Sequence, residues 1–120
     1  MTVPTGPFSK QDRIRSRAEY RALYGSCKAM HVGCLVFYAA SGDGPRRLGV
    51  TVPKKVGGAV VRNRVKRLVR EAFRQERGGL PDGCRIVVNA RHSAARLTLA
   101  EAMGAFRKVA ERLAREGYPQ

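Results

Sequence analysis

The alternation of hydrophobic and polar residues along the chain predicts its helices and strands. Ser16 and Glu19 have the spacing of a capping box and begin a short helix, which Gly25 ends. Two apolar runs follow at residues 34–40 and 48–52, and each has the length and composition of a strand. The glycine, aspartate and proline residues between these runs are typical of a tight turn, so we expect an antiparallel hairpin.

The second half of the chain has helical periodicity in two places. A long periodic segment covers residues 58–77, and Gly78 follows it at the position where a helix end favours glycine. Residues 85–89 form a third apolar run, and Thr98 with Glu101 makes the capping box of a last helix. That helix repeats apolar residues at the i, i+4, i+7 spacing, namely Leu99, Met103, Phe106, Ala110 and Leu113.

The order of these elements is helix, two strands, helix, strand and helix. It predicts an α+β fold in which the helices lie on one small sheet. A chain of 120 residues fits a single domain, and its 43% hydrophobic content supports one packed core. We therefore expect one domain over residues 1–120, of which residues 1–11, with two prolines and a glycine, are loosely held.

The chain is strongly positive, with 24 Lys and Arg against 9 Asp and Glu and a formal net charge of +15. Such an excess repels itself unless a polyanion neutralises it, which favours a nucleic-acid partner. A membrane surface is the competing polyanion, but Trp is absent and no apolar run is long enough to cross a bilayer. We therefore predict a nucleic-acid-binding domain without a membrane partner, and we predict no protein partner.

The three cysteines are odd in number and form no Cys-x-x-Cys pair. This usage is typical of reduced thiols and predicts a cytoplasmic location. Cys27, His31 and Cys34 could share a metal ion, but their spacing matches no common zinc pattern, so we predict no metal site.

The periodic segment at residues 58–77 concentrates the positive charge. Nine basic residues and two acidic ones lie between Lys54 and Arg77. A solvated helix face is the simpler interpretation, but such faces mix both signs because like charges at i, i+4 destabilise a helix. The excess of arginine therefore indicates an anionic partner, since guanidinium groups suit bidentate phosphate contacts. The opposite side of this helix is an apolar stripe that we expect to face the core: Val61, Val65, Leu68 and Ala72.

Within this segment, the string VVRNRVKRLVREAFR resembles the signature of the bacterial ribonuclease P protein family. The likeness extends to LGVTVPKK before it and to IVVNAR after it, and it covers most of the chain. The resemblance implies a single-domain sandwich of a small mixed sheet and three helices, like the second domain of ribosomal protein S5. It also implies that the basic helix lies in a left-handed βαβ crossover, which periodicity alone does not indicate. Residues 25–33 depart from the family pattern.

The resemblance further implies that the chain is the protein subunit of ribonuclease P, the endoribonuclease that removes the 5′ leader of precursor tRNA. In this family the RNA subunit performs the hydrolysis with Mg²⁺, and the protein carries no cofactor of its own. The implied partners are the catalytic RNA and precursor tRNA. The residues implied to bind the catalytic RNA are Lys54, Lys55, Arg62, Asn63, Arg64, Lys66, Arg67 and Arg70. Those implied to line a cleft for the leader are Tyr20, Tyr24 and Tyr38.

The residues alone leave two questions about this cleft open. Tyr20 and Tyr24 lie one helical turn apart, a spacing that suits core residues as well as a platform for stacking bases. On the strand at residues 34–40, only one of Phe37 and Tyr38 can face the cleft, because neighbouring side chains point to opposite sides.

Two other functional classes fit the sequence less well. A small ribosomal protein would share the charge but not the Arg-Asn-Arg signature with its lead-in. A nuclease needs clustered carboxylates or paired histidines, but the acidic residues are scattered singly and His31 and His92 are isolated. We therefore expect no catalytic residue on this chain.

Overall fold

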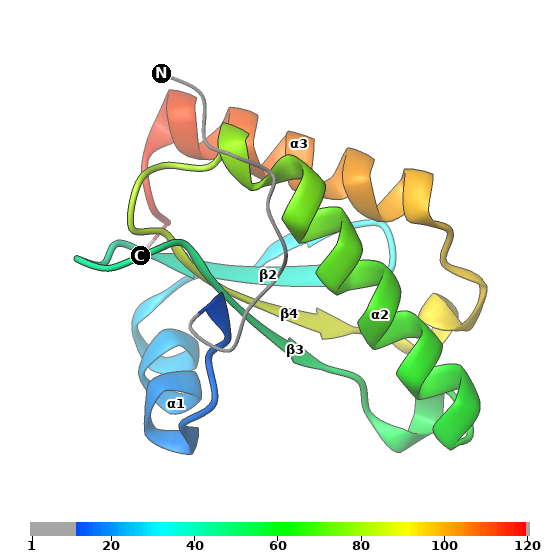
Figure 1. Cartoon of the computed structure of the whole chain (residues 1–120). Helices are drawn as coiled ribbons and strands as arrows, with labels where there is room; N and C mark the ends of the chain where they lie inside the picture. Colours follow the sequence, from blue (N-terminus) through cyan, green and yellow to red (C-terminus); the bar gives the residue numbers. More distant parts are fainter. Residues whose placement is uncertain (1–11, 120) are drawn as a thin grey trace.

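The computed structural model describes residues 12–119, which form a four-stranded sheet with helices on both faces (Figure 1). The elements follow the predicted order, with one additional short strand, β1. Their bounds are α1 Arg17–Ser26, β1 Met30–Val32, β2 Leu35–Ala40, β3 Arg47–Thr51, α2 Ala59–Glu76, β4 Arg85–Ala90 and α3 Leu99–Glu116. Short 3-10 helices connect them: η2 Lys54–Val56, η3 Arg77–Gly79 and η4 His92–Arg96. The predicted looseness of residues 1–11 concerns a segment outside the described residues.

The strand order is β1-β2-β4-β3, so β4 lies in the interior of the sheet. It pairs antiparallel with β2, with Val88 opposite Phe37, and parallel with β3, with Val87 opposite Gly49. The predicted hairpin between β2 and β3 is therefore wrong, because β4 separates the two strands. The physical reason is that Ile86, Val87 and Val88 are all fully buried. A strand buried on both faces belongs in the middle of a sheet.

The connection from β3 through α2 to β4 joins two parallel neighbours and makes a βαβ unit. In Figure 1, α2 lies in front of the sheet, both strands run from left to right, and β4 lies above β3. This arrangement is the left-handed crossover that the family resemblance implies, against the strong general preference for the right-handed form. The described chain is thus an α+β sandwich of a small mixed sheet and three α-helices.

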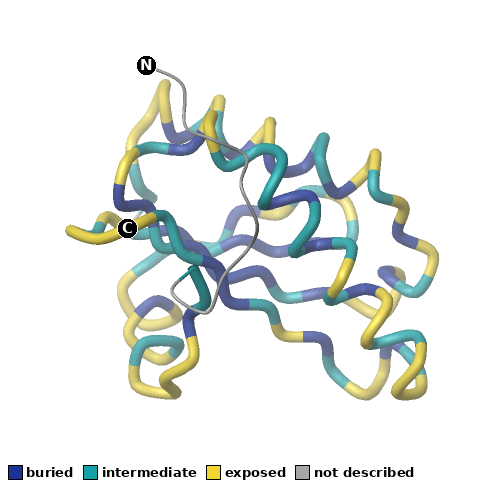
Figure 2. The backbone as a smooth tube through the Cα atoms, viewed as in Figure 1, coloured by how far each residue is buried: buried dark blue, intermediate teal, exposed yellow. Residues whose placement is uncertain are grey.

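The main core lies between the sheet and the two long helices α2 and α3, whose buried residues are dark blue in Figure 2. Phe37 of β2, Phe73 of α2 and Phe106 of α3 are fully buried there. The ring centroids of Phe37 and Phe106 are 5.2 Å apart, and those of Phe73 and Phe106 are 5.9 Å apart. Such aromatic contacts contribute about 0.5 to 1.5 kcal/mol each beyond area burial, so they hold three distant elements at one point.

The buried side of α2 is rotated relative to the predicted stripe. Val61 and Leu68, which the stripe included, are only partly buried. The fully buried residues are Val65, Val69, Ala72 and Phe73. The reason is that α2 packs against α3 as well as against the sheet, so its apolar side turns partly toward the neighbouring helix. On α3 the prediction holds for Phe106 and Leu113, whereas Leu99, Met103 and Ala110 are only partly buried.

The short helix α1 packs against the opposite face of the sheet. A smaller core there consists of Ile14, Leu23 and Val87. An ion pair reinforces it, because the two carboxylate oxygens of Glu19 accept hydrogen bonds from Arg47 of β3 at 2.7 and 2.9 Å. Glu19 therefore fixes α1 to the sheet and does not turn back to complete the predicted capping box.

Most helix ends follow the predicted signals. Ser16 begins α1, since its side chain accepts a hydrogen bond from the Ala18 amide. The helix continues one residue past Gly25, where we expected it to end. Thr98 and Glu101 form the predicted capping box of α3, in which each side chain accepts a hydrogen bond from the other residue's backbone amide.

The turn after β2 approaches the turn before β4 so closely that position 83 requires glycine. The φ angle of Gly83 is +72°, and a Cβ added there would lie 2.0 Å from the backbone oxygen of Gly42. We predict that Gly83→Ala lowers the free energy of unfolding by about 2 to 5 kcal/mol, because backbone strain and a steric clash add. Urea unfolding measures the change.

Gly117→Ala is the matched control for this substitution. Gly117 has a φ angle of +75°, but nothing lies within 4 Å of an added Cβ. We expect a loss of about 1 to 2 kcal/mol from the left-handed conformation alone. Equal losses in the two variants would contradict the proposed clash at position 83.

Candidate nucleic-acid interface

Three tyrosines come together on the α1 side of the sheet, and we call them the tyrosine cluster. Tyr20 and Tyr24 lie one turn apart on α1, and Tyr38 comes from β2. The ring centroids of Tyr20 and Tyr24 are 6.2 Å apart, and those of Tyr24 and Tyr38 are 4.9 Å apart. The structure thus brings together the three residues predicted for the cleft. Tyr24 is 37% exposed, so part of this aromatic surface is open to solvent.

The position of Tyr38 follows from the alternation of side chains along β2. Phe37 belongs to the main core and Tyr38 to the α1 side, which answers the question that the sequence left open. The same alternation in β4 places Asn89 on the face of Val87. The Tyr24 hydroxyl donates a hydrogen bond to Asn89 Oδ1 at 2.9 Å. Sequence reasoning missed Asn89. Its position two residues after Val87 in the same strand could have indicated that its side chain lies on the α1 side of the sheet.

Tyr20 is both a packed residue and a member of the tyrosine cluster, the two roles that the sequence left open. It packs against the smaller core, and its hydroxyl end lies against Gly49 of β3. A Cβ added to Gly49 would lie 2.5 Å from the Tyr20 hydroxyl oxygen. Burial, and next the neighbouring Tyr24, raise the pKa of Tyr20, while a hydrogen bond to the Val50 backbone opposes them. Tyr20 is thus seated against the sheet, and Tyr24 is the more exposed ring.

A groove of about 570 Å³ lies along the polar side of α2. We call it the basic groove, because five of its seven lining residues are cations. Arg67 is exposed there and has no partner among the residues that the structure describes. The lining residues are Arg13, Asn63, Lys66, Arg67, Arg70, Glu71 and Arg74. Four of the eight residues predicted to bind the catalytic RNA therefore share one surface.

Arg13 and Arg70 connect the basic groove to the tyrosine cluster. Both also line a second hollow of about 260 Å³, which Tyr20 and Gly49 border. Burial, and next the nearby Arg13, lower the pKa of Arg70. Like charges placed this close together favour a shared anion. Sequence reasoning missed Arg13, because it precedes the first helix in a stretch without periodicity.

The other four predicted residues lie outside the groove. Arg64 donates hydrogen bonds to two backbone carbonyls at the end of η4, at 3.1 and 2.7 Å, and so ties α2 to that segment. Arg62 donates to a backbone carbonyl just before α2, at 3.1 Å. Lys54 and Lys55 are exposed on η2. Arg62 and Arg64 thus have partners within the fold, whereas the two lysines extend the cationic surface beyond the groove.

Glu71 is the carboxylate of the basic groove. A hydrogen bond from Arg74, and next one from Gln75, lower the pKa of Glu71 to about 2. The carboxylate therefore stays ionised at neutral pH and is paired with Arg74. The groove nevertheless remains positive, because five cations line it beside this single anion.

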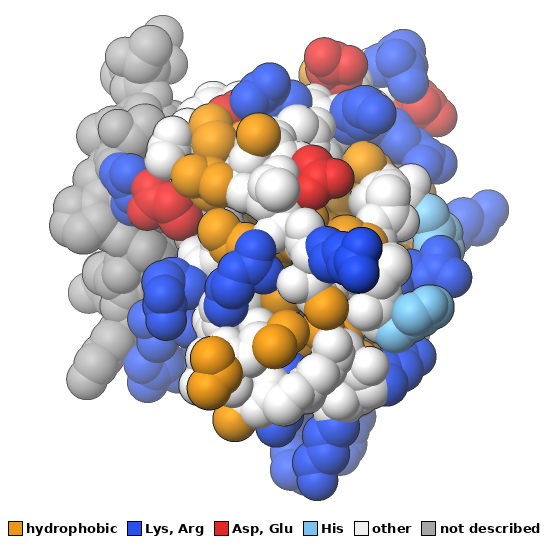
Figure 3. Space-filling view, turned by 90° about the vertical axis from the view of Figure 1, so that its right-hand side faces the viewer, with side chains coloured by type: hydrophobic (Ala, Val, Ile, Leu, Met, Phe, Trp, Pro, Cys, Tyr) orange, Lys and Arg blue, Asp and Glu red, His pale blue; other side chains and the backbone are white. Residues whose placement is uncertain are grey.

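Lys and Arg side chains are spread over the end of the molecule near the start of α2, and acidic side chains there are few (Figure 3). Across residues 12–119, which include all nine Asp and Glu residues, no three His, Cys, Asp or Glu side chains come close enough to hold a metal ion. No helix in this range is long and apolar enough to cross a membrane. The prominent chemical features of the described surface are therefore cationic and aromatic.

Fold and surface together define a class of protein. It is a small basic α+β protein whose mixed sheet carries an aromatic cluster on one face and packs against a cationic helix on the other. Comparison with known proteins gives the family, because the family model Ribonuclease P matches residues 8–114. The chain belongs to the ribonuclease P protein family, whose members are the protein component of a tRNA-processing endoribonuclease.

Two relatives, the ribonuclease P protein components of Shouchella clausii and Desulfosudis oleivorans, are each 41% identical to the chain. The first alignment covers 78% of this chain and 79% of the relative, and the second covers 78% of each. The RNase P protein of Staphylococcus aureus has a TM-score of 0.73 and 27% identity, over 87% of this chain and 95% of that one. The RNase P protein of Thermotoga maritima, in complex with 1-(4-fluorophenyl)-2-thiourea, has a TM-score of 0.74 and 28% identity. That match covers 83% of this chain and 98% of the Thermotoga maritima chain. The predicted family and fold are thus confirmed.

Gly49→Ala tests whether Tyr20 is seated against β3. We predict that it lowers the free energy of unfolding by about 1 to 3 kcal/mol, because the added methyl group overlaps the Tyr20 ring. In a Tyr20→Ala background the same substitution should raise that free energy by about 0.5 to 1 kcal/mol, since alanine loses less entropy than glycine in a strand. Urea unfolding of the four proteins measures the coupling. Equal destabilisation in both backgrounds would contradict the seating.

Proposed function

We propose that the chain binds the catalytic RNA of ribonuclease P and the 5′ leader of precursor tRNA, and so promotes endonucleolytic removal of the leader. The observation that carries this proposal is the junction at Arg13 and Arg70, where the basic groove meets the tyrosine cluster. Single-stranded RNA is held by aromatic rings that stack on its bases and by cations that contact its phosphates. Both kinds of side chain lie on adjoining surfaces of this protein.

The basic groove is the surface that we assign to the catalytic RNA. Folded RNA is recognised largely through its phosphates and its shape, which suits a helix rich in arginine. Lys54 and Lys55 prolong this surface, whereas Arg62 and Arg64 act mainly by holding the segments around the start of α2. The residues assigned to direct contact are Asn63, Lys66, Arg67 and Arg70.

The tyrosine cluster is the surface that we assign to the leader. Stacking of bases on aromatic rings is tolerant of sequence, because every base has a π face. Tyr24 is the ring best placed for stacking, since it is the most open of the three. Asn89 accepts the Tyr24 hydrogen bond through its side-chain oxygen, which leaves its amide nitrogen as a donor toward the RNA.

In this proposal the RNA subunit, with Mg²⁺, supplies the chemistry, and the protein holds the two RNAs together. Hydrolysis by paired metal ions relies on clustered carboxylates. The carboxylates of this chain stand apart, and several have a role in the fold, such as Glu19 with Arg47 and Asp82 with Arg46. The three cysteines are free thiols, which supports a location in the bacterial cytoplasm.

Reconstitution with a bacterial ribonuclease P RNA tests this proposal. We expect the chain to raise cleavage of precursor tRNA at the mature 5′ end when Mg²⁺ is low, because its cations replace part of the counterion screening between the two RNAs. The chain without RNA should cleave nothing. Gel separation of labelled precursor and product measures both activities. Cleavage at the mature 5′ end by the chain alone would overturn the proposal, as would a lack of stimulation.

Substitutions at two exposed positions separate the two surfaces. Tyr24→Ala should weaken binding of precursor tRNA to the holoenzyme by roughly tenfold to a hundredfold, the loss expected for one stacked base, and leave mature tRNA binding unchanged. Arg67→Ala should weaken binding of the catalytic RNA and reduce the slope of log affinity against log salt by about one. Filter binding over a salt series measures these effects.

Both positions are chosen because their side chains are exposed and lie outside the two buried cores, so we expect both variants to fold. Tyr24→Phe is the matched control: it keeps the ring, loses the hydrogen bond to Asn89 and should retain most of the affinity for precursor tRNA. An equal loss for both tRNA forms in Tyr24→Ala would place the leader elsewhere. An unchanged salt slope in Arg67→Ala would place the catalytic RNA elsewhere.

A further inference from the structure

The outer side of α1 carries two arginines that the proposed function does not use. Arg17 and Arg21 lie one helical turn apart, and both are exposed. Neither side chain has an ion pair or hydrogen-bond partner among residues 12–119. All nine Asp and Glu residues of the chain lie in that range, so no acidic side chain of this protein is paired with either arginine.

Several arginines elsewhere on the surface have acidic partners. On α3, Arg107 lies 3.2 Å from Glu76, and Arg112 lies 3.8 Å from Glu116. The only acidic residue of α1 is Glu19, and it is turned toward the sheet, where it is engaged with β3. The outer side of α1 therefore has positive charge without an internal counter-charge.

The two arginines are also unfavourable for α1 itself. Arg17 is the first residue of the helix, where the partial positive charge of the helix N-terminus repels a cation. Arg21 follows four residues later, the spacing at which like charges oppose helix formation. No contact in the described fold offsets these effects, so an anion outside the chain is the partner that their placement favours.

Helix geometry places this pair beside the tyrosine cluster. At about 100° of rotation per residue, the two tyrosines of α1 and then the two arginines follow one another around the helix in steps of about 20° to 40°. Tyr24 lies between Tyr20 and Arg17 in this order. The arginines thus form a ridge along the open edge of the cluster, which we call the α1 ridge.

We propose that Arg17 and Arg21 bind phosphates of the leader upstream of the nucleotides that stack on the tyrosine cluster. This inference rests on the proposed function. In single-stranded RNA each stacked base is followed by a phosphate, so a strand on Tyr24 brings its backbone to the neighbouring cations. The basic groove, assigned to the catalytic RNA, meets the cluster at Arg13 and Arg70. The leader therefore enters from that side, and its upstream nucleotides leave over α1.

A series of precursor tRNAs whose leaders are lengthened one nucleotide at a time tests the α1 ridge. With the unmodified chain, the affinity of the holoenzyme for precursor tRNA should rise in two steps as the leader is lengthened. The first rise comes when leader nucleotides occupy the tyrosine cluster, and the second comes when the leader reaches the α1 ridge. Arg17→Gln with Arg21→Gln should abolish the second rise and weaken binding of the long-leader precursor by about twofold to thirtyfold. For that precursor, the slope of log affinity against log salt should fall by up to about 1.4, which corresponds to two phosphates on a single strand.

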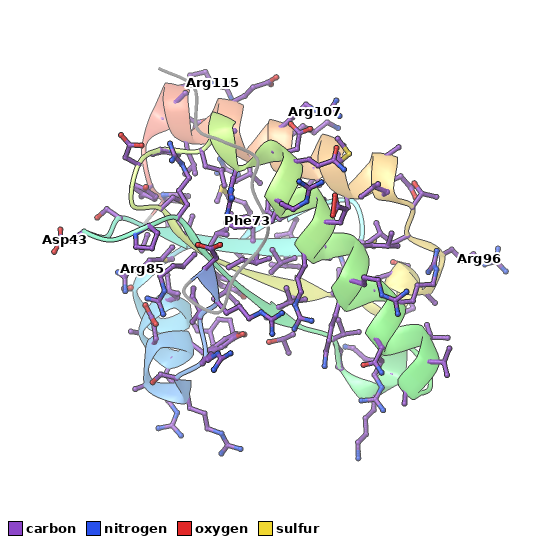
Figure 4. All side chains as sticks on the ribbon, in the orientation of Figure 1. Asp43, Phe73, Arg85, Arg96, Arg107 and Arg115 are labelled. Carbon is purple, nitrogen blue, oxygen red and sulfur yellow. The ribbon has the colours of Figure 1, made fainter. Side chains whose placement is uncertain are left out.

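Arg96→Gln with Lys108→Gln is the matched control. Both residues are exposed, lie in η4 and α3, and have no acidic partner within residues 12–119. Arg96 points into solvent at the end of the molecule away from α1 (Figure 4). This variant removes the same charge and should keep both rises. The melting temperature of the control variant should equal that of the unmodified chain. The melting temperature of the α1 variant should equal or exceed it, because glutamine relieves the repulsion between the two arginines on α1.

Three outcomes would overturn the α1 ridge. These are an undiminished second rise, a loss that is equal for every leader length and for mature tRNA, or an equal loss in the control variant. Tyr24→Ala measured in the same series distinguishes this failure from failure of the proposed function. If Tyr24→Ala weakens precursor binding and the arginine variant does not, only the ridge is wrong. If Tyr24→Ala has no precursor-specific effect, the assignment of the leader to the cluster is wrong.

Discussion

The pairing of β4 with β2 on one edge and β3 on the other is the constraint on which the rest of the structure depends. Side chains alternate between the two faces of the sheet along β2 and β4. Phe37 and Val88 therefore lie on the side of the long helices, and Tyr38 and Asn89 lie on the side of α1. The first face is closed by α2 and α3, whereas the second is covered only in part by a helix of ten residues. One sheet therefore supports both a tightly packed core and an open aromatic surface.

Local signals predicted the helices, and the family resemblance predicted the tyrosine cluster and the βαβ crossover, but neither gave β4 as the partner of β2. The turn residues at 42–45 end β2 whichever strand lies beside it, so they cannot show that β4 is the partner. The uninterrupted run Ile86 to Val88 carries that information, as a strand buried on both faces. Asn89 and Arg13 were missed for a related reason, because their roles come from neighbours distant in the sequence.

Net charge alone does not separate arginines that hold the fold from arginines that face solvent. Arg47 is engaged by Glu19, Arg46 by Asp82, and Arg64 by backbone carbonyls. Each carries the same charge as the exposed Arg67. Only tertiary proximity distinguishes them, which is why half of the eight predicted RNA-binding residues lie outside the basic groove.

The interior position of β4 also has a consequence for the order in which the chain is synthesised. The ribosome makes β2, β3 and α2 before it reaches β4, so the sheet cannot be completed until residue 90 of 120 has been made. Until then the nascent chain holds two strands whose shared partner does not yet exist, and unpaired strand edges are prone to aggregate. The cationic helix α2 is meanwhile already complete. The nascent chain must therefore remain soluble through its first three quarters with a charged helix present and no finished sheet to support it.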